Sequence, residues 1–221
     1  MGRLRVGGDA SIMEYRSIDK SMAQPAVTLD DQRAARRFTS LIRSAKLVCS
    51  QGEFVCVIRD VSSMGISLRM FHDLPVGDRV ALELQNGESF ELDKVREDGR
   101  EASFTFATPV SVESLIHESW RFPKRQLRLN IAMPLTITTL SGSTDAVTEN
   151  ISQQGCRLDC DVTFAIDQTL RVQGDHLPEI RAKVRWRKDT SYGLVFENTF
   201  TLSQFALLAA SLQAPHLACE N

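Results

Sequence analysis

Two arginines, an acid, a hydroxyl and a glycine are the residues of this chain whose types and order best suit nucleotide binding. Arg33 and Arg37 form an Arg-x-x-x-Arg pattern, and Asp60, Ser62 and Gly65 follow as Asp-x-Ser-x-x-Gly. A guanidinium binds phosphate through two parallel hydrogen bonds and stacks on purine rings. A carboxylate can accept from the N–H groups of guanine, a hydroxyl can bind a second edge or a phosphate, and glycine lets a ring approach the backbone. Together these residues predict a guanine nucleotide site.

The second half of the chain repeats this order with different cations. Lys124 stands where the first arginine is expected, and its ammonium is a point charge that neither forks onto a phosphate nor stacks on a ring. Its neighbour Arg125 can substitute for it. Because the turn residues repeat as well, we expect a tandem duplication in which the second copy binds ligand weakly or not at all. The second candidate set is Lys124, Arg125, Arg128, Asn150, Ser152 and Gly155.

Each of these features also has a purely structural interpretation. The basic run 33–37, which includes Arg36, can be a solvated surface. Asp60 and Ser62 can serve only to satisfy backbone groups of a turn. The same alternative applies more strongly to the second set. Trp120 and Trp186 are expected to be packing residues rather than platforms on which a base stacks.

Short β segments separated by turn residues fill both copies. Segments such as 79–84 and 89–95 alternate apolar and polar residues, as strands with one wet face do. Six such strands per copy predict a mainly β fold of two tandem six-stranded antiparallel barrels, which leave few exposed edges. The expected strands are 41–49, 53–60, 65–70, 79–84, 89–95 and 102–106, then 135–140, 146–151, 155–158, 169–172, 180–187 and 193–197.

Helices are expected only late in each copy. Residues 110–120 suit a short helix that links the two units. Residues 201–213 carry apolar side chains at helical spacing, with Thr201 or Ser203 as N-cap and Pro215 just beyond the end. This C-terminal helix is expected to pack on the second barrel, with dimerisation as the alternative. The predicted division is a flexible leader (1–30), domain 1 (31–120), domain 2 with the helix (121–214) and a tail (215–221).

The composition excludes several classes of protein. The 221-residue chain has 43% hydrophobic and 24% charged residues, which is ordinary for a folded protein. A net charge of −2 gives no global positive field, so no nucleic-acid partner is expected. No apolar run suits a membrane span, and residues 1–30 lack the apolar core of a secretory signal, which predicts a cytoplasmic protein.

No cofactor, metal or catalytic activity is expected. The five cysteines include no Cys-x-x-Cys pair, and the four histidines are scattered, so the thiols are expected to be buried in a reducing compartment. The sequence contains no P-loop, no Gly-x-Gly-x-x-Gly and no Ser-His-Asp arrangement.

Arg-x-x-x-Arg followed by [Asp/Asn]-x-Ser-x-x-Gly on a small β-barrel resembles the PilZ domain, and the resemblance spans roughly residues 30–213. It implies that the ligand is cyclic di-GMP, as a monomer or an intercalated dimer. It also implies that Arg33 and Arg37 lie on a loop that closes over the ligand, while Asp60, Ser62 and Gly65 receive a guanine. In the second copy, 183–196 resembles the closing hairpin of the family, and the first copy lacks the equivalent of Gly193.

The resemblance implies a receptor that relays the second messenger to a downstream protein, in motility, attachment, exopolysaccharide or cell-cycle control. Ordering of the arginine-rich loop would be the signal. The alternative is a degenerate tandem that binds a protein without any ligand. A barrel that binds single-stranded nucleic acid is disfavoured, because only 7% of the residues are aromatic and the net charge is negative.

Overall fold

The computed structural model describes residues 38–75, 77, 79–116 and 126–218. The predicted leader lies outside these residues, and so do five of the predicted site residues. None of the helices in the described part has the length and apolar content that crossing a bilayer requires. The site residues outside the described part are Arg33, Arg36, Arg37, Lys124 and Arg125.

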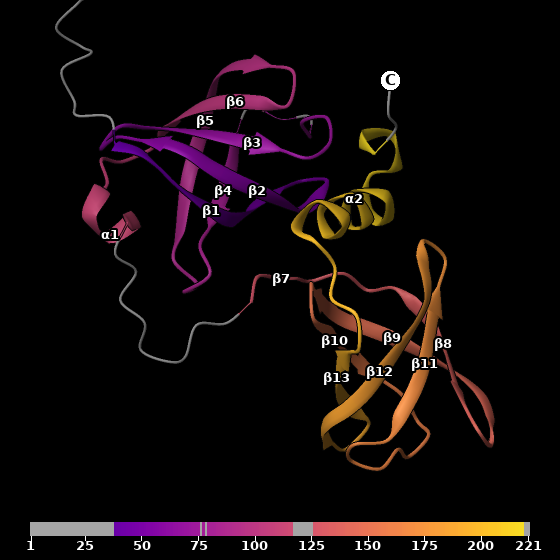
Figure 1. Ribbon diagram of the computed structural model, residues 1–221. Helices are drawn as coiled ribbons and strands as arrows, with labels where there is room; N and C mark the ends of the chain where they lie inside the picture. Colours follow the sequence, from indigo (N-terminus) through magenta and orange to yellow (C-terminus); the bar gives the residue numbers. More distant parts are fainter. Residues whose placement is uncertain (1–37, 76, 78, 117–125, 219–221) are drawn as a thin grey trace, which may run out of the picture. The chain divides into compact units, whose positions relative to one another are not determined.

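The first copy forms a closed barrel of six antiparallel strands in the order β1-β2-β3-β6-β5-β4 (Figure 1). Helix α1 (Val112–Ile116) follows the barrel and realises part of the linking helix expected over 110–120, of which 117–120 lie outside the described residues. The strands are β1 (Phe38–Cys49), β2 (Gly52–Val61), β3 (Gly65–Met70), β4 (Arg79–Glu83), β5 (Ser89–Asp98) and β6 (Glu101–Phe106).

The second copy closes in the same way, because β10 pairs with both β13 and β9. The expectation of two six-stranded antiparallel barrels is therefore confirmed. A two-residue strand, β7 (Arg128–Leu129), also pairs with the end of β9; the sequence does not predict it, since two residues show no periodicity. The barrel strands are β8 (Pro134–Thr139), β9 (Gly142–Ser152), β10 (Gly155–Asp159), β11 (Thr169–Gly174), β12 (Leu177–Lys188) and β13 (Ser191–Phe196).

Equivalent residues of the two copies occupy equivalent positions in the ladders. Asp60 pairs with Ser67 across β2 and β3, and Asn150 pairs with Arg157 across β9 and β10. In both ladders the register shifts directly beside this residue. Such a bulge increases the local twist and changes the direction of the neighbouring side chain. The Asp-x-Ser and Asn-x-Ser segments thus begin at the same irregularity of the two sheets.

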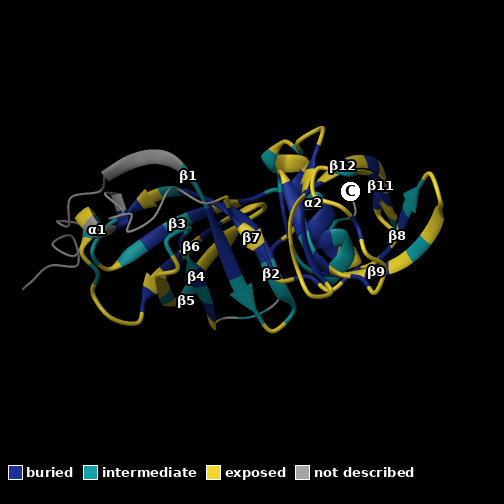
Figure 2. Cartoon of the chain, turned by 90° about the horizontal axis from the view of Figure 1, so that it is seen from below, coloured by how far each residue is buried: buried dark blue, intermediate teal, exposed yellow. Residues whose placement is uncertain are grey.

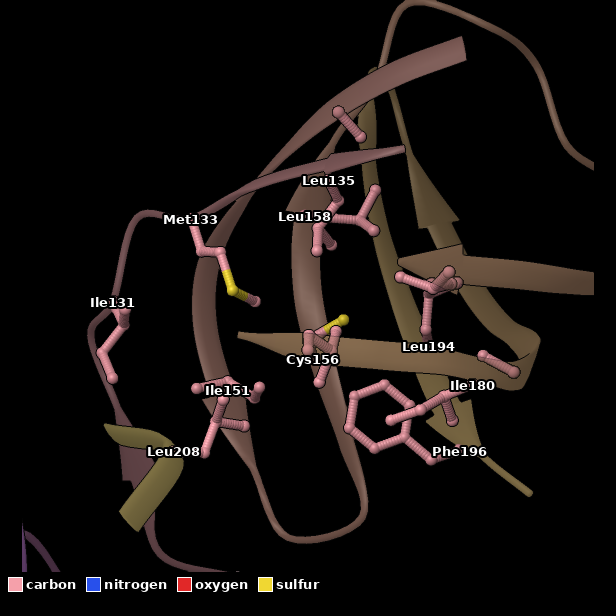
Figure 3. Close-up of a cluster of buried hydrophobic side chains, with 14 of the residues drawn as sticks. Ile131, Met133, Leu135, Ile151, Cys156, Leu158, Ile180, Leu194, Phe196 and Leu208 are labelled. Atoms are coloured by element: carbon pink, nitrogen blue, oxygen red, sulfur yellow. The ribbon is translucent and has the colours of Figure 1, made fainter. Parts of the chain in front are cut away.

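Burial follows the alternation expected for strands of small barrels (Figure 2). Apolar side chains from facing strands meet inside the second barrel (Figure 3), where Leu158 and Val184 are fully buried. Strand β2 is an exception, because both of its faces are buried. Phe54 belongs to the core of the first barrel, whereas its neighbour Val55 belongs to the core of the second. This explains the unbroken apolar run at 54–58.

Helix α2 (Leu202–Gln213) contacts both cores. Phe205 and Leu208 pack in the second barrel's core, as expected, whereas Ala210 belongs to that of the first. Thr201 caps the helix, and its side chain and that of Gln204 form a reciprocal capping box. The barrels and the helix belong to one compact unit. The apolar face that dimerisation would need is therefore used within the chain. A 3₁₀ turn, Pro215–Leu217, follows the helix.

Candidate ligand site

The Ser-x-x-Gly part of each motif builds the turn between the second and third strands of its barrel. The Ser62 hydroxyl accepts from Gly65 N at 3.0 Å and donates to Gly65 O at 3.2 Å, while Ser62 N also donates to Gly65 O. In the second copy, Ser152 is buried and its hydroxyl donates to Gly155 O at 3.0 Å. The serine therefore has a structural role in both turns, and a contact with ligand would be additional.

The glycine of the motif is needed where two strands approach each other. A Cβ on Gly155 would overlap the carbonyl oxygen of Leu194 on β13. On Gly65 it would lie 3.1 Å from the carbonyl oxygen of Phe104 on β6, which is tight but tolerable. Strand packing thus explains why glycine occupies this position without any contact to a ligand ring. The steric requirement for glycine is stronger in the second copy.

The side chains of Asp60 and Asn150 have no hydrogen-bond partner among the described residues. Asp60 is exposed and Asn150 is half-buried, and each lines a pocket on its own barrel. The carboxylate of Asp60 and the amide oxygen of Asn150 can therefore accept from the N–H groups of a base.

The larger of these two pockets lies on the second barrel and has a volume of about 490 Å³. It brings together Arg128, Asn150, Ser152 and Gly155, which are all the described members of the predicted second set. Arg128 is exposed, and its guanidinium has no hydrogen bond or ion pair with any described residue, so it is available to an anion. The pocket also contains residues that the motif does not include: Gln126, Arg157, Arg185, Trp186 and Gly193.

Trp186 presents an aromatic surface to this pocket. One part of the indole lies on Gly193, where a Cβ would overlap the ring, while 41% of the residue stays exposed. The guanidinium carbon of Arg157 lies 5.8 Å from the ring centroid. Arg157 is itself held by Glu149 Oε2 and Ser191 Oγ, both 2.9 Å from its Nε. Trp186 therefore packs on Gly193, as expected of a packing residue, and also leaves part of its ring exposed at the pocket.

The first barrel has a smaller pocket at the equivalent place, of about 290 Å³. The ladders place Arg96 where the second copy has Trp186, and Ser103 where it has Gly193. None of the described residues that line this pocket is basic. Its cations would have to come from the predicted set Arg33, Arg36 and Arg37, which lies outside the described residues.

The thiols are poor candidates for chemistry. Cys56, Cys156 and Cys160 are buried, as the sequence predicts, whereas Cys49 is only half-buried; all four are free, and Cys219 lies outside the described residues. Burial raises the pKa of the Cys156 thiol, at the edge of the larger pocket, to about 12. This thiol is therefore neutral near pH 7 and no nucleophile. No group of three metal-ligating side chains occurs among the residues that the structure describes.

Three of the residues beyond the motif, Arg185, Trp186 and Gly193, come from the closing hairpin of β12 and β13. The sequence carries a signal for them, since the stretch at 183–196 contains Trp186 and Gly193 and differs here from the first copy. The signal does not reveal that the tryptophan is exposed. That property follows from the register, which places the two residues opposite each other.

Two small closed antiparallel barrels, each with an Asp/Asn-x-Ser-x-x-Gly turn at the rim of a pocket, define a tandem of β-barrel modules with surface sites. The chain belongs to the PilZ domain family: the sequence profile of the PilZ domain matches residues 31–116 and 121–214. The predicted family is therefore confirmed. No curated protein matches the chain.

Several solved structures are similar to this chain at low sequence identity. The PlzA protein of Borreliella burgdorferi in complex with c-di-GMP is 9% identical over 83% of this chain and 96% of its own, with a TM-score of 0.34. The inhibitor of motility MotI/DgrA of Bacillus subtilis is 14% identical over 82% and 100%, also with a TM-score of 0.34. YcgR of Escherichia coli in complex with c-di-GMP is 11% identical over 74% and 80%, with a TM-score of 0.30.

Proposed function

We propose that this protein is a non-enzymatic receptor for cyclic di-GMP. The observation that carries the proposal is the pocket of the second barrel, where the unpaired guanidinium of Arg128, the unpaired amide of Asn150 and the exposed indole of Trp186 meet. Arg128 would bind a phosphate, Asn150 would accept from guanine N–H groups and Trp186 would stack on a base. Stacking of a base on an aromatic side chain contributes ~1–3 kcal/mol.

The first barrel would supply a second site. Asp60 is a stronger acceptor for guanine than an amide, because it carries a charge. Its partners would be Arg33, Arg36 and Arg37, together with Ser62 and Gly65. Contrary to the ranking expected from the motifs, we propose that the second site is the better preorganised of the two, because its cation and its aromatic surface are already in place.

Relay of the signal would follow from ordering of the arginine-rich segment or from a change in the contacts between the barrels. The downstream protein would act in motility, attachment, exopolysaccharide production or cell-cycle control. Absence of catalysis and of a nucleic-acid partner remain predictions from the sequence.

The test is isothermal titration of the full chain with cyclic di-GMP. We expect Arg128→Ala to weaken the second site by about tenfold or more, because charge-assisted hydrogen bonds contribute ~1.5–3 kcal/mol each. Arg33→Ala/Arg37→Ala should remove the first site and lower the stoichiometry. Arg171→Ala is the matched control, since it removes one exposed positive charge on β11 outside both pockets. Absence of heat and of any thermal shift in the wild type would instead favour a ligand-independent interaction module.

A further inference from the structure

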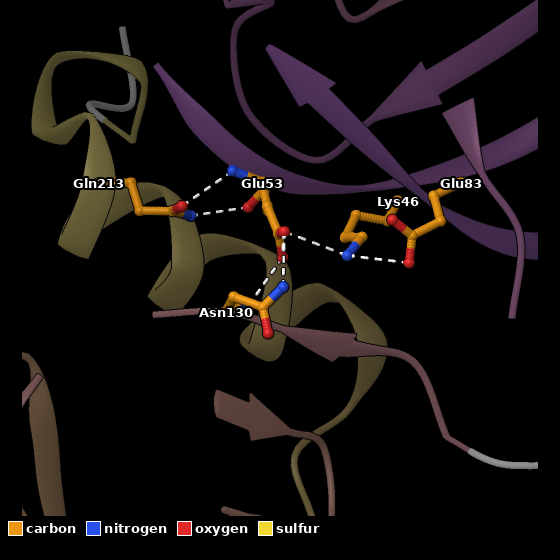
Figure 4. A network of polar contacts seen from close by, with 5 residues as sticks. All are labelled: Lys46, Glu53, Glu83, Asn130 and Gln213. Carbon is orange, nitrogen blue, oxygen red and sulfur yellow. Dashed lines mark hydrogen bonds and ion pairs between the residues drawn. The ribbon is translucent and has the colours of Figure 1, made fainter. Parts of the chain in front are cut away.

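Glu53 of β2 connects the first barrel to the strand that carries Arg128. Its carboxylate accepts two hydrogen bonds from Asn130, from the backbone N at 2.7 Å and from Nδ2 at 2.8 Å (Figure 4). Asn130 is the residue that follows β7 (Arg128–Leu129). The first barrel thus contacts the end of β7, the short strand whose Arg128 lines the pocket of the second barrel.

The position of Glu53 is fixed from three sides. Gln213 at the end of α2 accepts from Glu53 N at 2.8 Å and donates to Glu53 O at 2.7 Å. Lys46, which is 3% exposed, lies 3.1 Å from the Glu53 carboxylate and 3.0 Å from that of Glu83. A Cβ on Gly52, whose φ is +136°, would overlap the Gln213 amide. The buried Lys46 ammonium lies between two carboxylates, and Gly52 leaves the space that the Gln213 amide occupies. Both features fix Glu53 and indicate that its contact with Asn130 is specific.

The second barrel holds one side of strand β7, because Leu127, Leu129 and Ile131 are buried in its core. The two residues of β7 pair only with Ser152 and Ile151 of β9, and the described chain begins again just before it, at Gln126. Leu129 is fully buried, whereas Arg128 and Asn130 on either side of it are exposed. Without the bonds from Asn130 to Glu53, the exposed side of this segment, which carries Arg128, would have no contact with the first barrel. A ligand would then have to order this segment on binding, which lowers the affinity.

We propose that Glu53 is a positioning residue for the ligand site of the second barrel. By holding Asn130 it keeps Arg128 at the pocket, so the affinity of the second site depends on the contact between the two barrels. The effect is reciprocal, because a ligand that binds more tightly when the contact is made must also strengthen the contact. This inference rests on the proposed function.

The experiment is titration of the full chain with cyclic di-GMP, comparing the wild type with Glu53→Gln. Gln keeps the length of the side chain but replaces one acceptor oxygen by a donor. We expect the second site to weaken by about tenfold, corresponding to ~1.4 kcal/mol. Glu83→Gln is the matched control, since it alters the other carboxylate on Lys46 without touching Asn130; its affinity should stay within about twofold of the wild type.

A second variant separates positioning from a loss of folding. Asn130→Ala removes only the bond from Nδ2, so a loss of about threefold is expected, and the double variant should be no weaker than Glu53→Gln alone. Amide exchange at Asn130 gives an independent measurement, because ligand should slow it in the wild type and have less effect in Glu53→Gln. The inference about Glu53 would be overturned if Glu53→Gln bound cyclic di-GMP as tightly as the wild type, or if ligand did not change the exchange rate at Asn130. The proposed function would still stand. No binding by the wild type would overturn the proposed function as well.

Discussion

The indole of Trp186 on β12 lies against the backbone of Gly193 on β13, in the space where any other residue would place its Cβ. This pair turns the closing hairpin of the second barrel into part of the pocket wall. The first barrel has Arg96 and Ser103 at these positions. The two copies therefore differ in that only the second, among the described residues, has a tryptophan in its pocket wall.

Gly193→Ala is expected to displace the indole and to weaken cyclic di-GMP binding at the second site by about tenfold, comparable to Trp186→Ala, since stacking contributes ~1–3 kcal/mol per base. Titration calorimetry measures the affinity, and tryptophan fluorescence reports the displacement. Ser103→Ala, at the equivalent position of the first barrel, is the control and should leave the second site unchanged. Equal affinity in the wild type and Trp186→Ala would remove the indole from the site.

Alanine at the two motif glycines should affect stability unequally. Gly155→Ala forces a Cβ onto the carbonyl of Leu194, so we expect the free energy of unfolding to fall by ~1–3 kcal/mol, as overpacked sites do. Gly65→Ala meets only a tight 3.1 Å approach to Phe104 O and should cost less. Urea unfolding of the two variants measures the difference. A larger loss in Gly65→Ala would contradict this explanation.

Acid should destabilise the protein through His72. Burial lowers the pKa of this imidazole below its ordinary value of 6.5, outweighing the bond between Nδ1 and Asp73 O at 2.6 Å. Its Nε2 has no hydrogen-bond partner among the residues described. A lowered pKa in the folded state means that the unfolded chain binds the proton more readily. The contribution to stability is therefore present above pH 6.5 and lost as the pH falls through the folded-state pKa.

His72→Phe keeps the volume of a ring against Phe54 and removes this titration. We expect urea midpoints of the wild type to decrease between pH 7 and pH 5 more steeply than those of His72→Phe. Parallel pH profiles of the two proteins would show that His72 does not titrate in this range.

Alkylation should separate the half-buried thiol from the buried ones. Burial raises the pKa of Cys56 and of Cys156 to about 12, so both are neutral thiols in the folded protein at pH 8. Cys49 is half-buried, and among the four cysteines that the structure describes we expect it to react with iodoacetamide first. Mass spectrometry of peptides after a timed reaction identifies the modified residues. Cys156 that reacts as fast as Cys49 would mean that the edge of the larger pocket opens in solution.

The amino-acid sequence by itself determined the duplication, the class of fold and most of the strands. Alternating apolar residues predict strands, and turn residues predict where the strands end. Both are local properties, so a barrel of short strands can be predicted from them. Helix 201–213 was predicted from the sequence as well, because Thr201 and Pro215 lie just outside its two ends. The motif residues Asn150 and Ser152 were predicted in the same way, from their order and spacing.

The tertiary structure alone decided how residues distant in the sequence meet. Register brings Trp186 onto Gly193, so a residue predicted to be a packing residue also becomes part of a pocket. Asn130 and Glu53, 77 positions apart, become partners only because helix α2 packs on both barrels and β2 is buried on both faces. The sequence pattern records which side chains are apolar, whereas the partner of each face depends on how the whole chain packs.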